Sequence, residues 1–119
     1  MARLFLLLIV TLCTAQTPGP ADAARALLAE TPTHGAPPAH GLSPRLRSQG
    51  TAPVLADGWL WRDDPGHGPL EVRLLNIAGA VDDRPAYAVV LVRRGEGWGR
   101  RLTFIEGDGR WLLERACRF

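Results

Sequence analysis

The residues best suited to bind a partner lie in the stretch RRGEGWGRR. Arg93 and Arg94 precede a glycine-rich link that holds Trp98, and Arg100 and Arg101 follow it. Strands that pair across this link would gather the guanidinium groups at one end of a sheet, where like charges destabilise the pairing. Arginine matches carboxylates and phosphates in shape and charge. The pattern predicts either a binding surface for an acidic partner or a solvated hairpin tip whose charge is relieved by nearby acids.

A second candidate site is the stretch DDPGHG, with Asp63, Asp64 and His67. Two carboxylates and an imidazole could hold a divalent ion and support a metal-assisted hydrolase. However, Asp-Pro-Gly is also ordinary turn chemistry, and the side chains of adjacent aspartates point in different directions. The stretch therefore leaves two hypotheses, a structural turn and an alternative enzymatic site.

Catalytic nucleophiles and cofactor motifs have little support. Ser43 and Ser48 lack the glycine elbow that would activate a serine, and no histidine lies near Cys117 in the sequence. The glycines of GEGWG lack the helix and lysine of a phosphate-binding loop. We therefore predict no cofactor and no catalytic residue, and a binding protein rather than an enzyme.

The tryptophans suggest a third hypothesis. Trp59 and Trp61 lie two residues apart, just before the strand-rich part of the chain. With Trp111 they could line the concave face of a sheet and hold a small apolar ligand, or they could pack into the core. A small-molecule carrier is thus a further alternative.

The first residues have the layout of a secretory signal peptide, predicted to span residues 1–15. An arginine near the start is followed by the apolar run 4–12 and then by small residues, with cleavage after Ala15 or as late as residue 23. The apolar run has about half of the roughly 20 residues that a membrane-crossing helix needs. We expect an exported protein of the bacterial periplasm or exterior, without a stable membrane span once the signal is removed.

The cysteines leave two points open. Cys13 follows an apolar run and could carry the lipid of a lipoprotein, although Leu12 stands where that processing prefers a small residue. In an oxidising compartment Cys117 would then be either buried or paired with another chain. A place near the end of a final strand favours burial.

Composition narrows the function classes. All 14 basic residues are arginine, which together with abundant alanine, glycine and proline is typical of a GC-rich bacterial genome. A formal net charge of +2 gives no global attraction to nucleic acid. A chain of 119 residues is long enough for one modest domain.

Residues 16–41 are predicted to form a short helix, 21–30, and a linker rich in proline and glycine. Asp22 is the expected helix cap. Residues 42–119 are predicted to form a small α+β domain that opens with a second short helix capped by Ser43.

Four strands are expected in the second half of the chain, at 70–77, 86–93, 100–106 and 110–117. The second, AYAVVLVR, is apolar on both faces and belongs in the middle of a sheet. Glu-Gly-Asp-Gly, at 106–109, is typical of a hairpin turn. Short glycine-bearing links predict an antiparallel meander for the last three strands. In the last strand, the side shared by Trp111, Leu113, Arg115 and Cys117 is expected to face the core.

The stretch RLTFIEGDGRWLLERACR resembles the C-terminal end of a bacterial exported domain family of unknown function with a cystatin-like or nuclear-transport-factor-like fold. LSPRLRSQ is similar to the helix end that precedes the sheet in such domains. The resemblance covers about 42–117 and implies a curved antiparallel sheet with a helix across it. Some relatives are periplasmic immunity proteins that block amidase toxins delivered by type VI secretion, which implies an inhibitor-like or immunity-like role. Pro32, Pro37 and Pro38 break the region where these domains carry longer helices, so the expected fold is an abridged one of one or two short helices on a four-stranded sheet.

Overall fold

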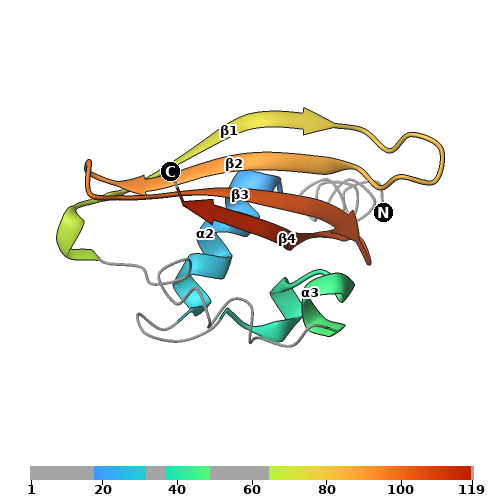
Figure 1. Cartoon of the computed structure of the whole chain (residues 1–119), viewed down its shortest axis with the longest axis horizontal. Helices are drawn as coiled ribbons and strands as arrows, with labels where there is room; N and C mark the ends of the chain where they lie inside the picture. Colours follow the sequence, from blue (N-terminus) through green and yellow to red (C-terminus); the bar gives the residue numbers. More distant parts are fainter. Residues whose placement is uncertain (1–17, 32–36, 49–64, 119) are drawn as a thin grey trace, which may run out of the picture.

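The computed structural model describes residues 18–31, 37–48 and 65–118. A four-stranded antiparallel sheet carries helix α2 across one face, as Figure 1 shows. The predicted α+β class is therefore confirmed. No helix in the described segments is long and apolar enough to cross a membrane.

The sheet is a simple meander whose spatial order, β1-β2-β3-β4, is also the order along the chain. Each strand begins and ends within two residues of its predicted range, because alternating side chains and glycine-bearing links mark both ends. The apolar strand β2 lies in the interior of the sheet, as expected. The strands are β1 (Leu70–Ala78), β2 (Tyr87–Arg94), β3 (Trp98–Gly107) and β4 (Arg110–Arg118).

Helix α2 (Pro20–Glu30) forms where the sequence predicts it, with one change at its start. The N-cap is Gly19, and Asp22 lies at the third helical position, where its carboxylate accepts a 3.3 Å hydrogen bond from the Gly19 amide. The C-cap is Thr31, whose hydroxyl donates a 2.6 Å hydrogen bond to the carbonyl of Leu27.

A short segment covers the outer edge of β4. It consists of the 3-10 turn η1 (Ala39–Gly41) and helix α3 (Pro44–Ser48). Between them, Leu42 forms a parallel bridge to Leu113, and the Ser43 amide donates a 2.8 Å hydrogen bond to the Leu113 carbonyl. The Ser43 hydroxyl accepts a 3.3 Å hydrogen bond from the Leu46 amide, as expected of an N-cap.

The core lies between α2, the α3 segment and one face of the sheet. Large apolar side chains from all these elements are withdrawn from water there, which supplies most of the folding free energy. The buried cluster comprises Ala24, Leu27, Leu28, Leu42, Leu46, Val90, Val92, Trp98, Leu102, Phe104 and Leu113.

The predicted hairpin turn between β3 and β4 is confirmed. Gly107 pairs with Arg110, and both intervening residues have positive φ, 55° at Asp108 and 75° at Gly109. This is the backbone of a type I′ turn, which matches the twist of the strands that it joins.

A β-bulge interrupts the pairing of β3 with β4. Phe104 pairs with Leu113, but the preceding Thr103 pairs with Arg115, so that Glu114 is an extra residue on β4. The side chain of Arg45 in α3 donates hydrogen bonds to the carboxylate and to the carbonyl of Glu114. The bulge is thereby fastened to the segment that covers this edge.

The bulge makes the predicted facing of β4 wrong in its second half. Trp111 and Leu113 pack on the core as expected. Beyond the bulge the alternation is reversed, so Ala116 packs on the core, while Arg115 and Cys117 lie on the opposite face. Arg115 is exposed, and Cys117 is a half-buried free thiol. If Glu114 were paired regularly in the ladder, Arg115 would be turned into the core, where an unpaired charge is costly.

Candidate functional site

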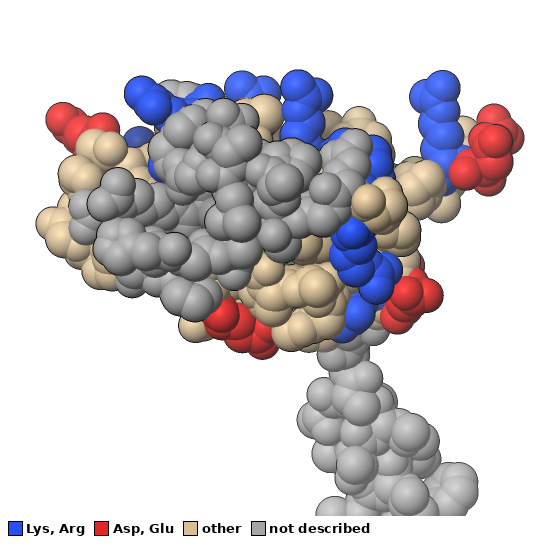
Figure 2. Space-filling view, turned by 60° about the horizontal axis from the view of Figure 1, so that its bottom comes forward, with Lys and Arg blue, Asp and Glu red and all other residues tan. Residues whose placement is uncertain are grey.

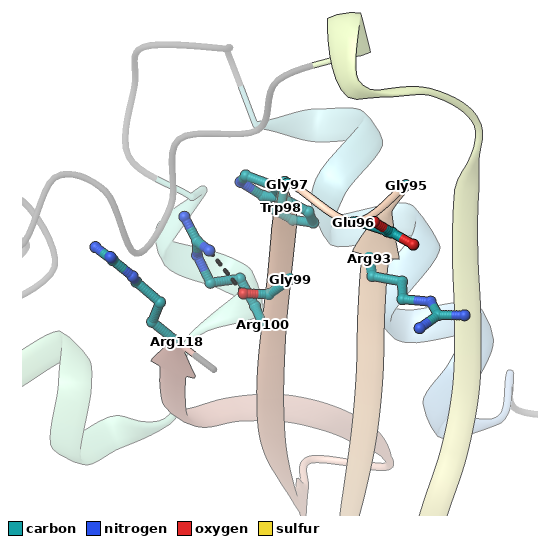
Figure 3. Close-up of a pocket in the computed structure, with 8 residues that line it drawn as sticks. All are labelled: Arg93, Gly95, Glu96, Gly97, Trp98, Gly99, Arg100 and Arg118. Atoms are coloured by element: carbon teal, nitrogen blue, oxygen red, sulfur yellow. Dashed lines mark hydrogen bonds between the residues drawn. The ribbon is translucent and has the colours of Figure 1, made fainter.

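An open pocket of about 590 Å³ lies at one end of the sheet. The β2–β3 turn, the start of β1 and the end of β4 meet at this end (Figure 1). Three arginines and one glutamate are among the lining residues, so the pocket is basic. Its lining is formed by Arg93, Gly95, Glu96, Gly97, Trp98, Gly99, Arg100 and Arg118 (Figure 3).

The strand register divides the four predicted arginines between the two faces of the sheet. Arg94 pairs with Trp98, and Arg100 follows two residues later, so these three side chains share the face that carries α2. Arg93 and Arg101 lie on the other face, and Arg101 is exposed and outside the pocket lining. The arginines therefore form two pairs rather than a single cluster.

Arg100 is held firmly in place. Its side chain is on the core face and only 6% of the residue is exposed. The guanidinium carbon lies 4.8 Å from the ring centre of Trp98, at cation–π distance, and Nη1 donates a 2.6 Å hydrogen bond to the Gly99 carbonyl. Trp98 is itself 6% exposed, in strand β3 and not in the link where the sequence had suggested it. A guanidinium positioned in this way loses little conformational entropy when it binds an anion.

Arg118 is the site residue that sequence reasoning missed. It lies directly opposite Arg100 across β3 and β4, and both side chains point to the same side in Figure 3. Counting back along an unbroken ladder from the Gly107–Arg110 pair would place Cys117 opposite Arg100 instead. The bulge shifts the partner by one residue, and no local signal in the sequence reveals that shift.

Arg93 turns away from Arg100 and Arg118 toward β1 (Figure 3). Its Nε donates a hydrogen bond to the carboxylate of Glu71, the residue that it pairs with on β1. This hydrogen bond, and then the charge of Arg93, lower the pKa of Glu71, and the same contact raises the pKa of Arg93. Both side chains are about half exposed, so the ion pair is screened by solvent.

Arg94 and His67 tie the chain before β1 to the β2–β3 turn. Arg94 donates a 3.0 Å hydrogen bond to the Gly68 carbonyl. His67, in the 3-10 turn η3 (Pro65–His67), packs against the turn glycines: a Cβ on Gly97 would lie 2.6 Å from Nδ1 of His67, and one on Gly95 2.5 Å from its carbonyl oxygen. Both turn glycines are thus required for this close approach. The stretch DDPGHG and the stretch RRGEGWGRR, which the sequence suggests as separate candidate sites, therefore adjoin each other through His67.

Of the three residues of the metal-site hypothesis, the structure describes one, His67. His67 is exposed at the surface, whereas Asp63 and Asp64 lie outside the described residues. Within residues 18–31, 37–48 and 65–118, no three histidine, cysteine or acidic side chains group together as metal ligands would.

A second cavity, of about 430 Å³, lies on the α2 side of the sheet. Trp111 and Phe104 contribute aromatic surface to it, and Leu27 contributes an aliphatic one. His40 and Glu30 meet at its rim at 2.9 Å. The other two tryptophans of the carrier hypothesis, Trp59 and Trp61, lie outside the described residues.

The face of the molecule seen in Figure 2 is not uniformly basic. In Figure 2 several arginines stand along one margin, and acidic side chains lie at both ends of the molecule. Because the formal net charge of the chain is only +2, the positive character of the pocket is local, which suits recognition of a defined acidic group better than bulk attraction of a polyanion.

Comparison with protein-family profiles, with curated proteins and with solved structures found no similar protein.

Proposed function

We propose that this chain is an exported, non-enzymatic binding domain that captures an acidic surface of a protein partner in the bacterial cell envelope, in an inhibitor-like or immunity-like role. The observation that carries the proposal is the direct opposition of Arg100 and Arg118, beside Trp98, in an open pocket. Like charges directly opposite each other oppose strand pairing. A partner carboxylate that enters the pocket would accept charge-assisted hydrogen bonds from both guanidinium groups.

The chemistry of the pocket favours a protein partner. Arginine and tryptophan are the residues most often found as anchors in protein interfaces. Arg100 and Trp98 are ordered by their mutual contact, and Arg101 extends the positive surface around the strand to the other face. An aspartate or glutamate on the partner would enter the pocket, and its surroundings would rest on the glycine-rich turn.

The proposal is tested by capture of envelope proteins on the immobilised wild-type chain and on Arg118→Glu. The matched control is Arg84→Glu, which makes the same charge change in the β1–β2 link, remote from the pocket. We expect a partner that the wild type and the control retain and that Arg118→Glu loses. Equal retention by both variants would remove the pocket from the interaction.

A small-ligand carrier is the second candidate, supported by the cavity beneath Trp111. A volume of about 430 Å³ is within the usual range for small-molecule sites, and the apolar lining suits an aromatic or aliphatic ligand. Titration with apolar fluorescent probes, with Trp111→Ala for comparison, tests it. Binding that is unchanged in the variant would argue against this cavity.

A further inference from the structure

Among the residues that the structure describes, the outer edge of β1 is the open edge of the sheet. The other outermost strand, β4, is covered by Leu42 and Ser43, which bond to Leu113. Within the described segments, β2 is the strand that pairs with β1, and none pairs with its outer side. A long edge strand with free backbone groups is a template for pairing with another chain.

Apolar side chains accompany this open edge. Leu74, Leu75 and Ile77 are 43%, 47% and 53% exposed, although β1 belongs to the same sheet as the core strands. By register, Leu74 opposes Val90 and so lies on the face that carries α2, beyond the well-covered part of the core. Exposed leucine and isoleucine on an unpaired edge indicate a surface that is covered in an assembly.

We propose that β1 pairs antiparallel with β1 of a second copy of this chain, joining two four-stranded sheets into one of eight strands. The pairing is centred on Val72. The two copies are related by a twofold axis normal to the sheet, so the side chains of two directly opposed residues lie on the same face. Because side chains alternate between the faces, each residue can oppose only a residue an even number of positions away in the sequence. The register must therefore be centred on a single residue.

Charge selects the centre of this register. A pairing centred on Glu71 sets two carboxylates against each other, and one centred on Arg73 sets two guanidinium groups against each other, which is unfavourable in both cases. The pairing centred on Val72 places Glu71 opposite Arg73 of the second copy, twice by symmetry. Registers centred further along meet the irregularity between Leu74 and Asn76, which disturbs the ladder.

The same register also covers apolar surface. Leu70, which packs against the core, falls opposite the exposed Leu74 of the second copy, again twice. Arg93 remains bonded to Glu71, so that each carboxylate would lie between an arginine of its own chain and one of the other copy. In the register centred on Val72, the β1 edge therefore pairs opposite charges, Glu71 with Arg73, and apolar side chains, Leu70 with Leu74.

A charge-exchange experiment tests the proposal by analytical ultracentrifugation of the purified protein. The wild type should dimerise with rising concentration. Glu71→Arg and Arg73→Glu each place like charges in opposition and should each sediment as monomers. An equimolar mixture of the two variants should dimerise again, because each new arginine at position 71 then faces a new glutamate at position 73.

The mixture separates a lost interface from a lost fold, since unfolded variants would not restore each other's association. Arg84→Glu, with the same charge change as Arg73→Glu but in the β1–β2 link, should dimerise like the wild type. A wild-type chain that remains monomeric at about 1 mM, where even weak association is visible, would overturn the proposal. So would a mixture that stays monomeric.

Discussion

Arg100 and Arg118 lie directly opposite each other on adjacent strands, on the face that carries α2, at the mouth of an open pocket. Arg100 is buried and stacked on Trp98, whereas Arg118 is exposed. Cross-strand neighbours of like charge oppose the sheet that holds them. Two guanidinium groups that face the same pocket can bind one acidic group together.

Arg118→Glu should stabilise the free protein while it abolishes partner capture. The new carboxylate would face Arg100, and a favourable cross-strand charge pair contributes about 0.2–1 kcal/mol. Urea denaturation of the variant and the wild type measures the difference in unfolding free energy. A lower stability would show that Arg118 is held by favourable contacts that outweigh its repulsion from Arg100.

Gly97→Ala should destabilise the fold. The added Cβ would lie 2.6 Å from Nδ1 of His67, so the imidazole or the turn η3 that carries it must move, and overpacking of this kind costs about 1–3 kcal/mol. Gly79→Ala is the matched control, because a Cβ there meets nothing within 4 Å. Thermal unfolding of both variants measures the contrast. Equal melting temperatures would mean that His67 shifts at no cost.

The carboxyl of Glu71 should titrate below its ordinary pKa, since Arg93 donates a hydrogen bond to it. Its contribution to stability is complete above the unfolded-state pKa of 4.5 and is lost as the pH falls through the lower folded-state value. NMR titration of the side chain measures this. Arg93→Gln should raise the pKa of Glu71, and Arg84→Gln should leave it unchanged; an unchanged value in Arg93→Gln would disprove the attribution.

Metal binding separates the enzymatic alternative from the binding domain. We expect no stoichiometric metal in the purified protein and no thermal shift on adding divalent ions, because adjacent aspartates in a turn rarely converge on one ion. Elemental analysis and thermal-shift assays of the wild type and His67→Ala measure this. A metal-dependent shift that His67→Ala removes would favour the hydrolase hypothesis instead.

The sheet could be predicted from the sequence because its signals are local. The alternation in β3, the continuous apolar run of β2 and the turn at Asp108–Gly109 each indicate one structure within a few residues. The same holds for α2, where alanines and leucines precede Thr31 and a proline. The order of the strands follows from the short links between them.

The site could be predicted only in part. Arg93 and Arg94 are adjacent, and alternation alone would have assigned them to opposite faces. The approach of His67 to Gly97 could not be predicted, because it joins residues on separate elements. The glycines of GEGWG predict a tight turn, but the sequence does not indicate that His67 packs against them.

The bulge at Glu114 reverses which side chains of β4 face the core. Because Glu114 is left out of the ladder, the side chains after it face the opposite way from regular alternation, and Arg118 rather than Cys117 lies opposite Arg100. A change that made Glu114 pair regularly would therefore exchange Arg118 for Cys117 opposite Arg100, and so alter the recognition chemistry of the pocket without any substitution among the residues that line it.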